Sequence, residues 1–123
     1  MDTEPAVKNN LIMIKVYIAS PYTIGNTAVN VRVQIDAVNK LMNYKFAPFS
    51  PLYSYFQHMI HPRPWEDWME VDFVWVEACD CILRLPGESS GADQEVKLAK
   101  KLNKPIFYSI DELLIHYGHK KSK

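Results

Sequence analysis

The segment "DCILRLPGESSGADQEVKLAKKLNKPIFYS", residues 80–109, decides the expected fold because it reads as strand, loop, helix and strand in turn. The apolar run at 80–85 ends in a proline–glycine pair, which is typical of a loop. Residues 91–102 then carry apolar side chains at helical spacing, and residues 105–109 predict another strand. Two strands joined by a helix indicate a parallel pair with a right-handed crossover.

The same alternation continues through the rest of the chain. Strands are predicted in "LIMIKVYIAS" at 11–20 and in "YKFAPFSP" at 44–51. Further helices are predicted at 27–44, from about Pro64 to 78, and at 111–118. These elements together predict an α/β fold: a Rossmann-like, flavodoxin-like three-layer sandwich with a four- to five-stranded parallel sheet and helices on both faces.

Two segments add local expectations. The helix at 27–44 should be capped by Asn26 or Thr27 and should turn one apolar stripe inward, namely Val31, Ile35, Val38 and Met42. Residues 52–64 are rich in prolines, aromatic residues and histidines and are interpreted as a functional loop. Ligands bind such sheets beyond the carboxyl ends of the strands, so the loops at 20–26, 49–64 and 86–91 should surround the site.

Composition narrows the classes of protein and partner. The 123 residues suit a single domain spanning 1–123, with flexible ends at 1–10 and 119–123. Fourteen basic and fourteen acidic residues cancel, so no nucleic acid polymer is expected as a partner. No apolar run reaches the roughly 20 residues of a membrane span, so we expect no membrane association and a cytoplasmic location. Cys79 and Cys81 are interpreted as core thiols, and neither a metal nor a cofactor is expected.

Glu95 is the residue that departs from the pattern. The predicted helix places it on an otherwise apolar stripe with Ala92, Ala99 and Leu102. A carboxylate at such a position must be hydrogen-bonded, lie at a wet edge or have a function. Its place in the first turn would itself stabilise a negative charge, so a plain capping role is the alternative.

Asp72 interrupts the stripe of the preceding helix in the same way. The members of that stripe are Trp65, Trp68, Met69, Asp72, Val76 and Cys79. As an alternative, Asp72 would accept hydrogen bonds from Tyr or Trp groups in the core. Two misplaced acids suggest one shared site, and paired carboxylates suit the chemistry of glycosidic bonds.

Four segments resemble the nucleoside 2-deoxyribosyltransferase superfamily, including its nucleoside 5′-monophosphate N-glycosidase branch. They are "VYIASPYT" at 16–23, "DFVWVEACD" at 72–80, "LPGESSGADQE" at 85–95 and the following "VKLAKKLNKPIF". The resemblance implies a Rossmann-like homodimer or higher homo-oligomer. It also implies that Glu95 is the nucleophile at C1′ of the sugar, that Asp72 donates the proton to the base and that Tyr17 steadies the nucleophile.

The resemblance further implies a substrate site. Ser20, Ser89 and Gly91 align with groups that hold a 5′-phosphate in the monophosphate branch, although Ser89 has helix capping as its alternative. Tyr22 stands where the monophosphate hydrolases carry an arginine, which Arg63 or Arg84 would have to replace. Asp80 is expected to have a structural role.

Aromatic residues, among them Phe49 and Trp68, could stack on the base or simply pack in the core. The expected partner is a small-molecule nucleoside or nucleotide.

Three interpretations remain at this point. The first is an enzyme that cleaves or transfers at the N-glycosidic bond of a (deoxy)nucleoside or its 5′-monophosphate. The second is a non-catalytic nucleotide-binding or sensing module, which the "ADQE" sequence at 92–95 favours because the transferases have a glycine before the catalytic Glu. The third is an interaction protein whose apolar "FVWVEAC" segment, 73–79, is a subunit surface.

Overall fold

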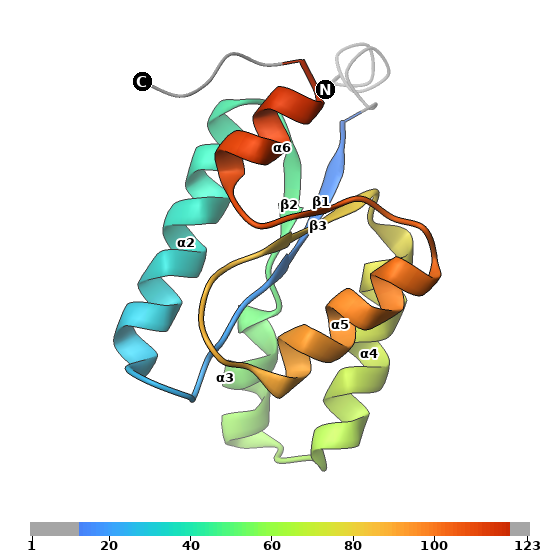
Figure 1. The fold of residues 1–123 in the computed structure, drawn as a ribbon. Helices are drawn as coiled ribbons and strands as arrows, with labels where there is room; N and C mark the ends of the chain where they lie inside the picture. The colour runs from blue at the N-terminus through green and yellow to red at the C-terminus, as the bar shows by residue number, and fades with distance from the viewer. Residues whose placement is uncertain (1–12, 119–123) are drawn as a thin grey trace, which may run out of the picture.

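The computed structural model describes residues 13–118, which form four strands and five helices (Figure 1). The strands are β1 (Lys15–Ala19), β2 (Ala47–Phe49), β3 (Cys81–Arg84) and β4 (Ile106–Phe107). The helices are α2 (Thr27–Asn43), α3 (Leu52–Ile60), α4 (Trp65–Ala78), α5 (Ser90–Lys101) and α6 (Ile110–His116). The termini that the sequence predicts to be flexible, 1–10 and 119–123, lie outside the described residues.

The four strands pair in the order β2-β1-β3-β4, and every pair is parallel. Tyr17 of β1 is in register with Phe49 of β2 and with Ile82 of β3. Parallel pairing brings the carboxyl ends of the strands to one edge of the sheet. The α/β fold with a four-stranded parallel sheet, predicted from the alternation of elements, is confirmed.

Helices cover both faces of the sheet (Figure 1). On one face, Val16, Ile18 and Leu83 pack in a core with residues of α2 and α6. On the other, Tyr17 and Ile82 pack with residues of α4 and α5. Successive residues of a strand point to opposite faces, which is why neighbouring positions of β1 serve different cores. These layers form the predicted three-layer sandwich.

The predicted apolar stripe of α2 is only partly correct, because Val38 packs against the core whereas Ile35 and Met42 do not. Ile35 and Met42 are 54% and 58% exposed, and the buried side chains are those of Gln34, Ala37 and Leu41. Gln34 can be buried because its amide is satisfied: Nε2 donates to the Pro21 carbonyl at 3.2 Å, and Oε1 accepts from the Ser50 hydroxyl at 2.7 Å. The expected cap is present, since the Asn26 side chain accepts a hydrogen bond from the backbone N–H of Val29.

The interpretation of residues 52–64 as a loop is also wrong over most of the segment, because α3 occupies Leu52–Ile60. Pro51 precedes the helix, and the Ser54 hydroxyl donates to its carbonyl at 2.8 Å. No residue of α3 is buried, and the helical spacing of Leu52, Tyr55, Phe56 and Met59 was outweighed by the prolines on either side of the segment. Within residues 13–118, no helix combines the length and the apolar character needed to cross a bilayer.

Candidate active site

The structure brings Tyr17, Asp72 and Glu95 together below the carboxyl edge of the sheet. Tyr17 is fully buried, and its hydroxyl donates to Glu95 Oε2 at 2.8 Å. Glu95 is 4% exposed and Asp72 is 9% exposed. The two carboxyl groups are close enough to exchange a hydrogen bond when one of them is protonated. Two acids separated by a whole strand and loop in the chain therefore form one buried pair.

Local structure explains how each side chain reaches the pair. Tyr17 faces α4 and α5 because it alternates along β1 with residues that face the opposite core. Glu95 lies on the buried side of α5, whose first turn is fixed by Ser89: the side-chain oxygen accepts from the Ala92 N–H at 3.1 Å. Asp72 lies on the buried side of α4 with Met69 and Val76.

Burial governs the protonation of the pair. It raises the pKa of Glu95, and the charge of Asp72 raises it further, while the Tyr17 hydrogen bond and the Arg84 charge offset this only in part. Burial also raises the pKa of Asp72, although less strongly, against the effect of its hydrogen bonds with Glu95 and Tyr17. Near neutral pH the pair therefore shares one proton.

Tyr17 remains a hydrogen-bond donor over the whole accessible pH range. Its pKa is raised far above the ordinary value, chiefly by burial and then by the charges of Glu95 and Asp72. A phenol with a raised pKa keeps its proton, so it stabilises an ionised Glu95 without becoming a base itself. The arrangement thus joins one permanent donor to two carboxyl groups that can exchange a proton.

A cavity of about 550 Å³ opens onto the carboxyl pair. This volume falls in the range of small-molecule sites. Its walls come from the loop after β1, from α3 and the start of α4, and from the loop that enters α5. Besides Asp72 and Glu95, the lining includes Ser20, Tyr22, Tyr55, His58, Arg63, Trp68, Glu88, Ser89 and Gly91.

Aromatic rings form one wall of this cavity. Tyr22 and Tyr55 stack face to face, with ring centroids 3.4 Å apart and an interplanar angle of 6°. Burial raises the pKa of Tyr55, and the charges of Glu95 and Asp72 raise it further, so this phenol lies within electrostatic reach of the pair. Trp68 Nε1 donates to His58 Nδ1 at 2.8 Å. The wall offers flat apolar surface beside two carboxyl groups.

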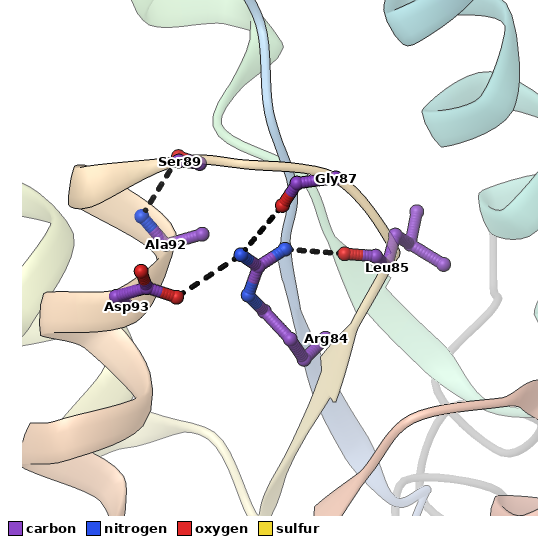
Figure 2. Close-up of polar contacts among 6 residues, drawn as sticks. All are labelled: Arg84, Leu85, Gly87, Ser89, Ala92 and Asp93. Carbon is purple, nitrogen blue, oxygen red and sulfur yellow. Dashed lines mark hydrogen bonds and ion pairs between the residues drawn. The ribbon is translucent and has the colours of Figure 1, made fainter.

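Arg84 fixes the loop that leads into α5 (Figure 2). Its guanidinium donates to the carbonyls of Leu85 and Gly87 and pairs with Asp93 at 3.0 Å. Only 10% of the Arg84 side chain is exposed. Gly87 has φ +116°, and an added Cβ would lie 2.7 Å from Pro21 Cγ, so the loop passes the β1 loop more closely than a side chain allows.

Comparison with known proteins identifies the family to which the chain belongs. The sequence model described as "Domain of unknown function (DUF7768)" matches residues 14–109. The chain belongs to this family. A search among curated proteins found no match.

Two solved structures share the fold of this family member. One is a 2-deoxyribosyltransferase from the psychrotolerant bacterium Bacillus psychrosaccharolyticus, with a TM-score of 0.53 and 18% identity over 85% of this chain and 82% of that one. The other is a 2-desoxiribosyltransferase from Leishmania mexicana, with a TM-score of 0.57 and 21% identity over 89% of this chain and 75% of that one. The resemblance inferred from the four sequence segments is confirmed at the level of the fold.

Most of the substrate-site residues predicted from the sequence line one cavity. They are Ser20, Tyr22, Trp68, Ser89 and Gly91. Phe49 differs: it is not among the described residues that line the cavity. Its ring stacks on Trp75 at 4.8 Å and 18° and packs beside Tyr17, so its position is that of a core residue. Asp80 has the expected structural contact, since it accepts from the Lys15 backbone N–H at 2.8 Å.

Sequence reasoning missed three features of the site. Tyr55 lies in the segment interpreted as a loop, although its spacing from Leu52 is helical. Gln34 connects the loop after β1 to the segment before α3 through its hydrogen bonds to Pro21 and Ser50. Its polar side chain gave no sign in the sequence that it lies on the inward side of α2. Glu88 lines the cavity and has no periodic signal because it lies in a loop.

Proposed function

We propose that the protein is an enzyme that cleaves or transfers at the N-glycosidic bond of a (deoxy)nucleoside or nucleoside 5′-monophosphate. The observation that supports this most directly is the buried Asp72–Glu95 pair, held by the Tyr17 hydroxyl and open to a cavity of about 550 Å³. The shared fold of two 2-deoxyribosyltransferases agrees with the proposal. Two carboxyl groups and a flat apolar wall are what nucleoside chemistry requires.

In the proposed first step, an oxygen of ionised Glu95 attacks C1′ of the sugar while the bond from C1′ to the base nitrogen breaks. Asp72 gives its proton to the departing base, so the step forms a glycosyl ester on Glu95 and leaves Asp72 ionised. In the second step, water attacks C1′ and gives a proton to Asp72. The ester bond between C1′ and Glu95 breaks, which leaves Glu95 as a carboxylate. A second base in place of water completes a transfer, and both routes retain the configuration at C1′.

The separation of the carboxyl groups supports a retaining course. Groups that can exchange a hydrogen bond lie too close together to leave the gap of about 6.5 to 9.5 Å that inverting enzymes need for water. Roughly 5 Å is typical of retaining enzymes. A nucleophile and a proton donor therefore describe the pair better than a base and an acid on opposite sides of the sugar.

The chemistry needs the shared proton on Asp72 and a negative charge on Glu95. A hydrogen bond between the two carboxyl groups provides the route by which the proton moves from one group to the other. Two groups favour the productive form, because the Tyr17 hydroxyl and the positive charge of Arg84 both stabilise an ionised Glu95. A base nitrogen that accepts a hydrogen bond from Asp72 would complete the shift when substrate binds.

The test is release of free base, measured by chromatography, from a panel of deoxynucleosides, ribonucleosides and their 5′-monophosphates. The expected result is release by the wild-type protein, and a loss of at least about a thousandfold in Glu95→Ala while ligand binding persists. Glu77→Ala, a change of an exposed acid on α4, is the matched control and should retain activity. Release by Glu95→Ala at the wild-type rate would refute the proposed nucleophile.

A non-catalytic nucleotide-binding or sensing module is the second candidate. The burial that raises the pKa of Glu95 favours it, since a protonated carboxyl group is no nucleophile. Such a module would bind ligand in the same cavity without turnover. Binding by calorimetry together with no release of base from any member of the panel would establish it.

We also propose that the protein forms a homodimer or higher homo-oligomer through the exposed side of α4. Val71, Val74 and Trp75 are 49%, 62% and 45% exposed there, and a stripe of this kind is normally covered. Light scattering at micromolar concentration should give at least twice the mass of one chain. A Val74→Glu variant should then be monomeric, and a wild-type monomer would contradict the proposal.

A further inference from the structure

We propose that the cavity selects uncharged nucleosides and discriminates against their 5′-monophosphates. The inference rests on the proposed function and narrows its substrate class. A phosphate group adds about two negative charges at neutral pH. Whether the cavity accepts it depends on which charges line the walls and which of them are free to act.

Acidic groups outnumber basic groups in the lining. Asp72, Glu88 and Glu95 all face the cavity, and after the shared proton is counted they carry about two negative charges near neutral pH. Arg63 is the one Lys or Arg among the lining residues that the structure describes, and it pairs with Asp67 at 3.4 Å. A phosphate would therefore enter a site that already repels it.

His58 adds no positive charge in this arrangement. Its Nδ1 accepts hydrogen bonds from Trp68 Nε1 at 2.8 Å and from the Arg63 backbone N–H at 3.2 Å. An imidazole nitrogen that accepts carries no proton, so the ring is neutral. The residue serves to hold Trp68 and the turn before α4 rather than to bind an anion.

Arg84 could compensate a phosphate from the loop side, but its guanidinium is already engaged. The carbonyls of Leu85 and Gly87 and the carboxylate of Asp93 take its donors (Figure 2). Arg84 is not among the described residues that line the cavity. Releasing it would leave loop carbonyls without their donor. Arg84 is therefore committed to the loop.

The positive end of the α5 dipole already has negatively charged side chains near it. The positive end of a helix attracts anions, but here Glu88 precedes the helix, Asp93 lies in its first turn and Glu95 follows. Ser89 already accepts the hydrogen bond from the Ala92 N–H. Glu88 and Glu95 thus already place carboxyl groups where a 5′-phosphate would have to bind, while Asp93 is paired with Arg84.

What the cavity does offer suits a neutral ligand. The stacked Tyr22 and Tyr55 rings and the Trp68 side chain present flat surface for a base. Carboxylate and serine oxygens can accept or exchange hydrogen bonds with sugar hydroxyls. A free 5′-hydroxyl can donate to Glu88, whereas a phosphate in its place cannot.

The experiment compares kcat/KM for the four common 2′-deoxynucleosides with the values for their 5′-monophosphates. The expected ratio is at least about tenfold in favour of the nucleosides, which corresponds to about 1.4 kcal/mol. Raising the ionic strength should increase kcat/KM for the monophosphates and leave the nucleosides nearly unchanged. Monophosphates that are cleaved as well as the nucleosides, or better, would overturn the inference while the proposed function would stand.

A charge variant tests the cause. Glu88→Gln should lower the ratio several-fold by improving the monophosphate, whereas Glu77→Gln, remote from the cavity, should keep the wild-type ratio. A ratio in Glu88→Gln equal to that of wild type would overturn the electrostatic origin. If no compound releases base, the proposed function fails, and calorimetry with Glu95→Gln then tests the inference separately. The inference predicts tighter binding of the nucleosides. Tighter binding of the monophosphates would refute it.

Discussion

Replacing Tyr17 by phenylalanine removes a single hydroxyl group from the proposed site and leaves its shape intact. That hydroxyl is fully buried and donates to Glu95 Oε2 at 2.8 Å. A hydrogen bond to a charged group contributes about 1.5 to 3 kcal/mol. Because it stabilises ionised Glu95, the form that attacks, its loss should lower kcat/KM by about 10- to 100-fold.

The direction of the pH dependence follows from the same contact. The Tyr17 hydrogen bond lowers the pKa of Glu95, so Tyr17→Phe should raise that pKa further. The pair loses its shared proton at high pH, and with it the proton that Asp72 must donate. The alkaline limb of the profile of kcat/KM should therefore move to higher pH in the variant, around a lower maximum.

The assay is base release, followed from pH 5 to about 10 with the nucleoside that the wild-type protein cleaves fastest. Tyr53→Phe is the matched control because Tyr53 is 74% exposed on α3, and it should give the wild-type profile. If Tyr17→Phe reproduces both the maximum and the alkaline limb of the wild-type protein, then Tyr17 does not control the charge of Glu95 and the reasoning fails.

Three further changes test the forces around the site. Glu95→Gln should raise the free energy of unfolding by about 1 to 3 kcal/mol at pH 8 and by almost nothing at pH 4. The reason is that a carboxyl group with a raised pKa contributes its full stability only below its ordinary pKa and loses this contribution as the pH rises. Urea titrations that show no gain at pH 8 would contradict this. Gly87→Ala should lower the midpoint of thermal unfolding, with a loss of about 1 to 3 kcal/mol from its positive φ and the approach to Pro21, and an unchanged midpoint would count against the close approach. Asp80→Ala should cost about 1 kcal/mol in the same experiment because the Lys15 N–H loses its acceptor, whereas Asp80→Asn, which keeps an oxygen, should retain most of the stability.

The sheet and the carboxyl pair could be predicted from the sequence because both leave periodic signals. A buried parallel strand is a continuous apolar run, and helices α4 and α5 carry buried stripes that Asp72 and Glu95 interrupt. An acid on such a stripe has few physical explanations, and its helical position fixes which way it faces. The fold and the convergence of the two acids follow from these signals, since parallel strands bring their loops to one edge.

The features that were not predicted have weaker or conflicting signals. Leu52, Tyr55, Phe56 and Met59 of α3 are spaced as on one side of a helix, but prolines at 51, 62 and 64 surround the segment and favour a loop. Gln34 is buried through hydrogen bonds to Pro21 and Ser50, partners that only the tertiary structure brings near it. Gln34 lies on the inward side of α2, whereas the more apolar residues Ile35 and Met42 face outward. Hydropathy alone predicts the opposite orientation of the helix.

The most direct measurement is mass spectrometry of the protein quenched in acid during turnover of a 2′-deoxynucleoside. The proposed mechanism predicts a population heavier by one deoxyribosyl group, with the added mass on the peptide that contains Glu95 and none in Glu95→Gln. Turnover by the wild-type protein without any adduct, or with the sugar attached to another residue, would contradict the central claim that Glu95 is the nucleophile.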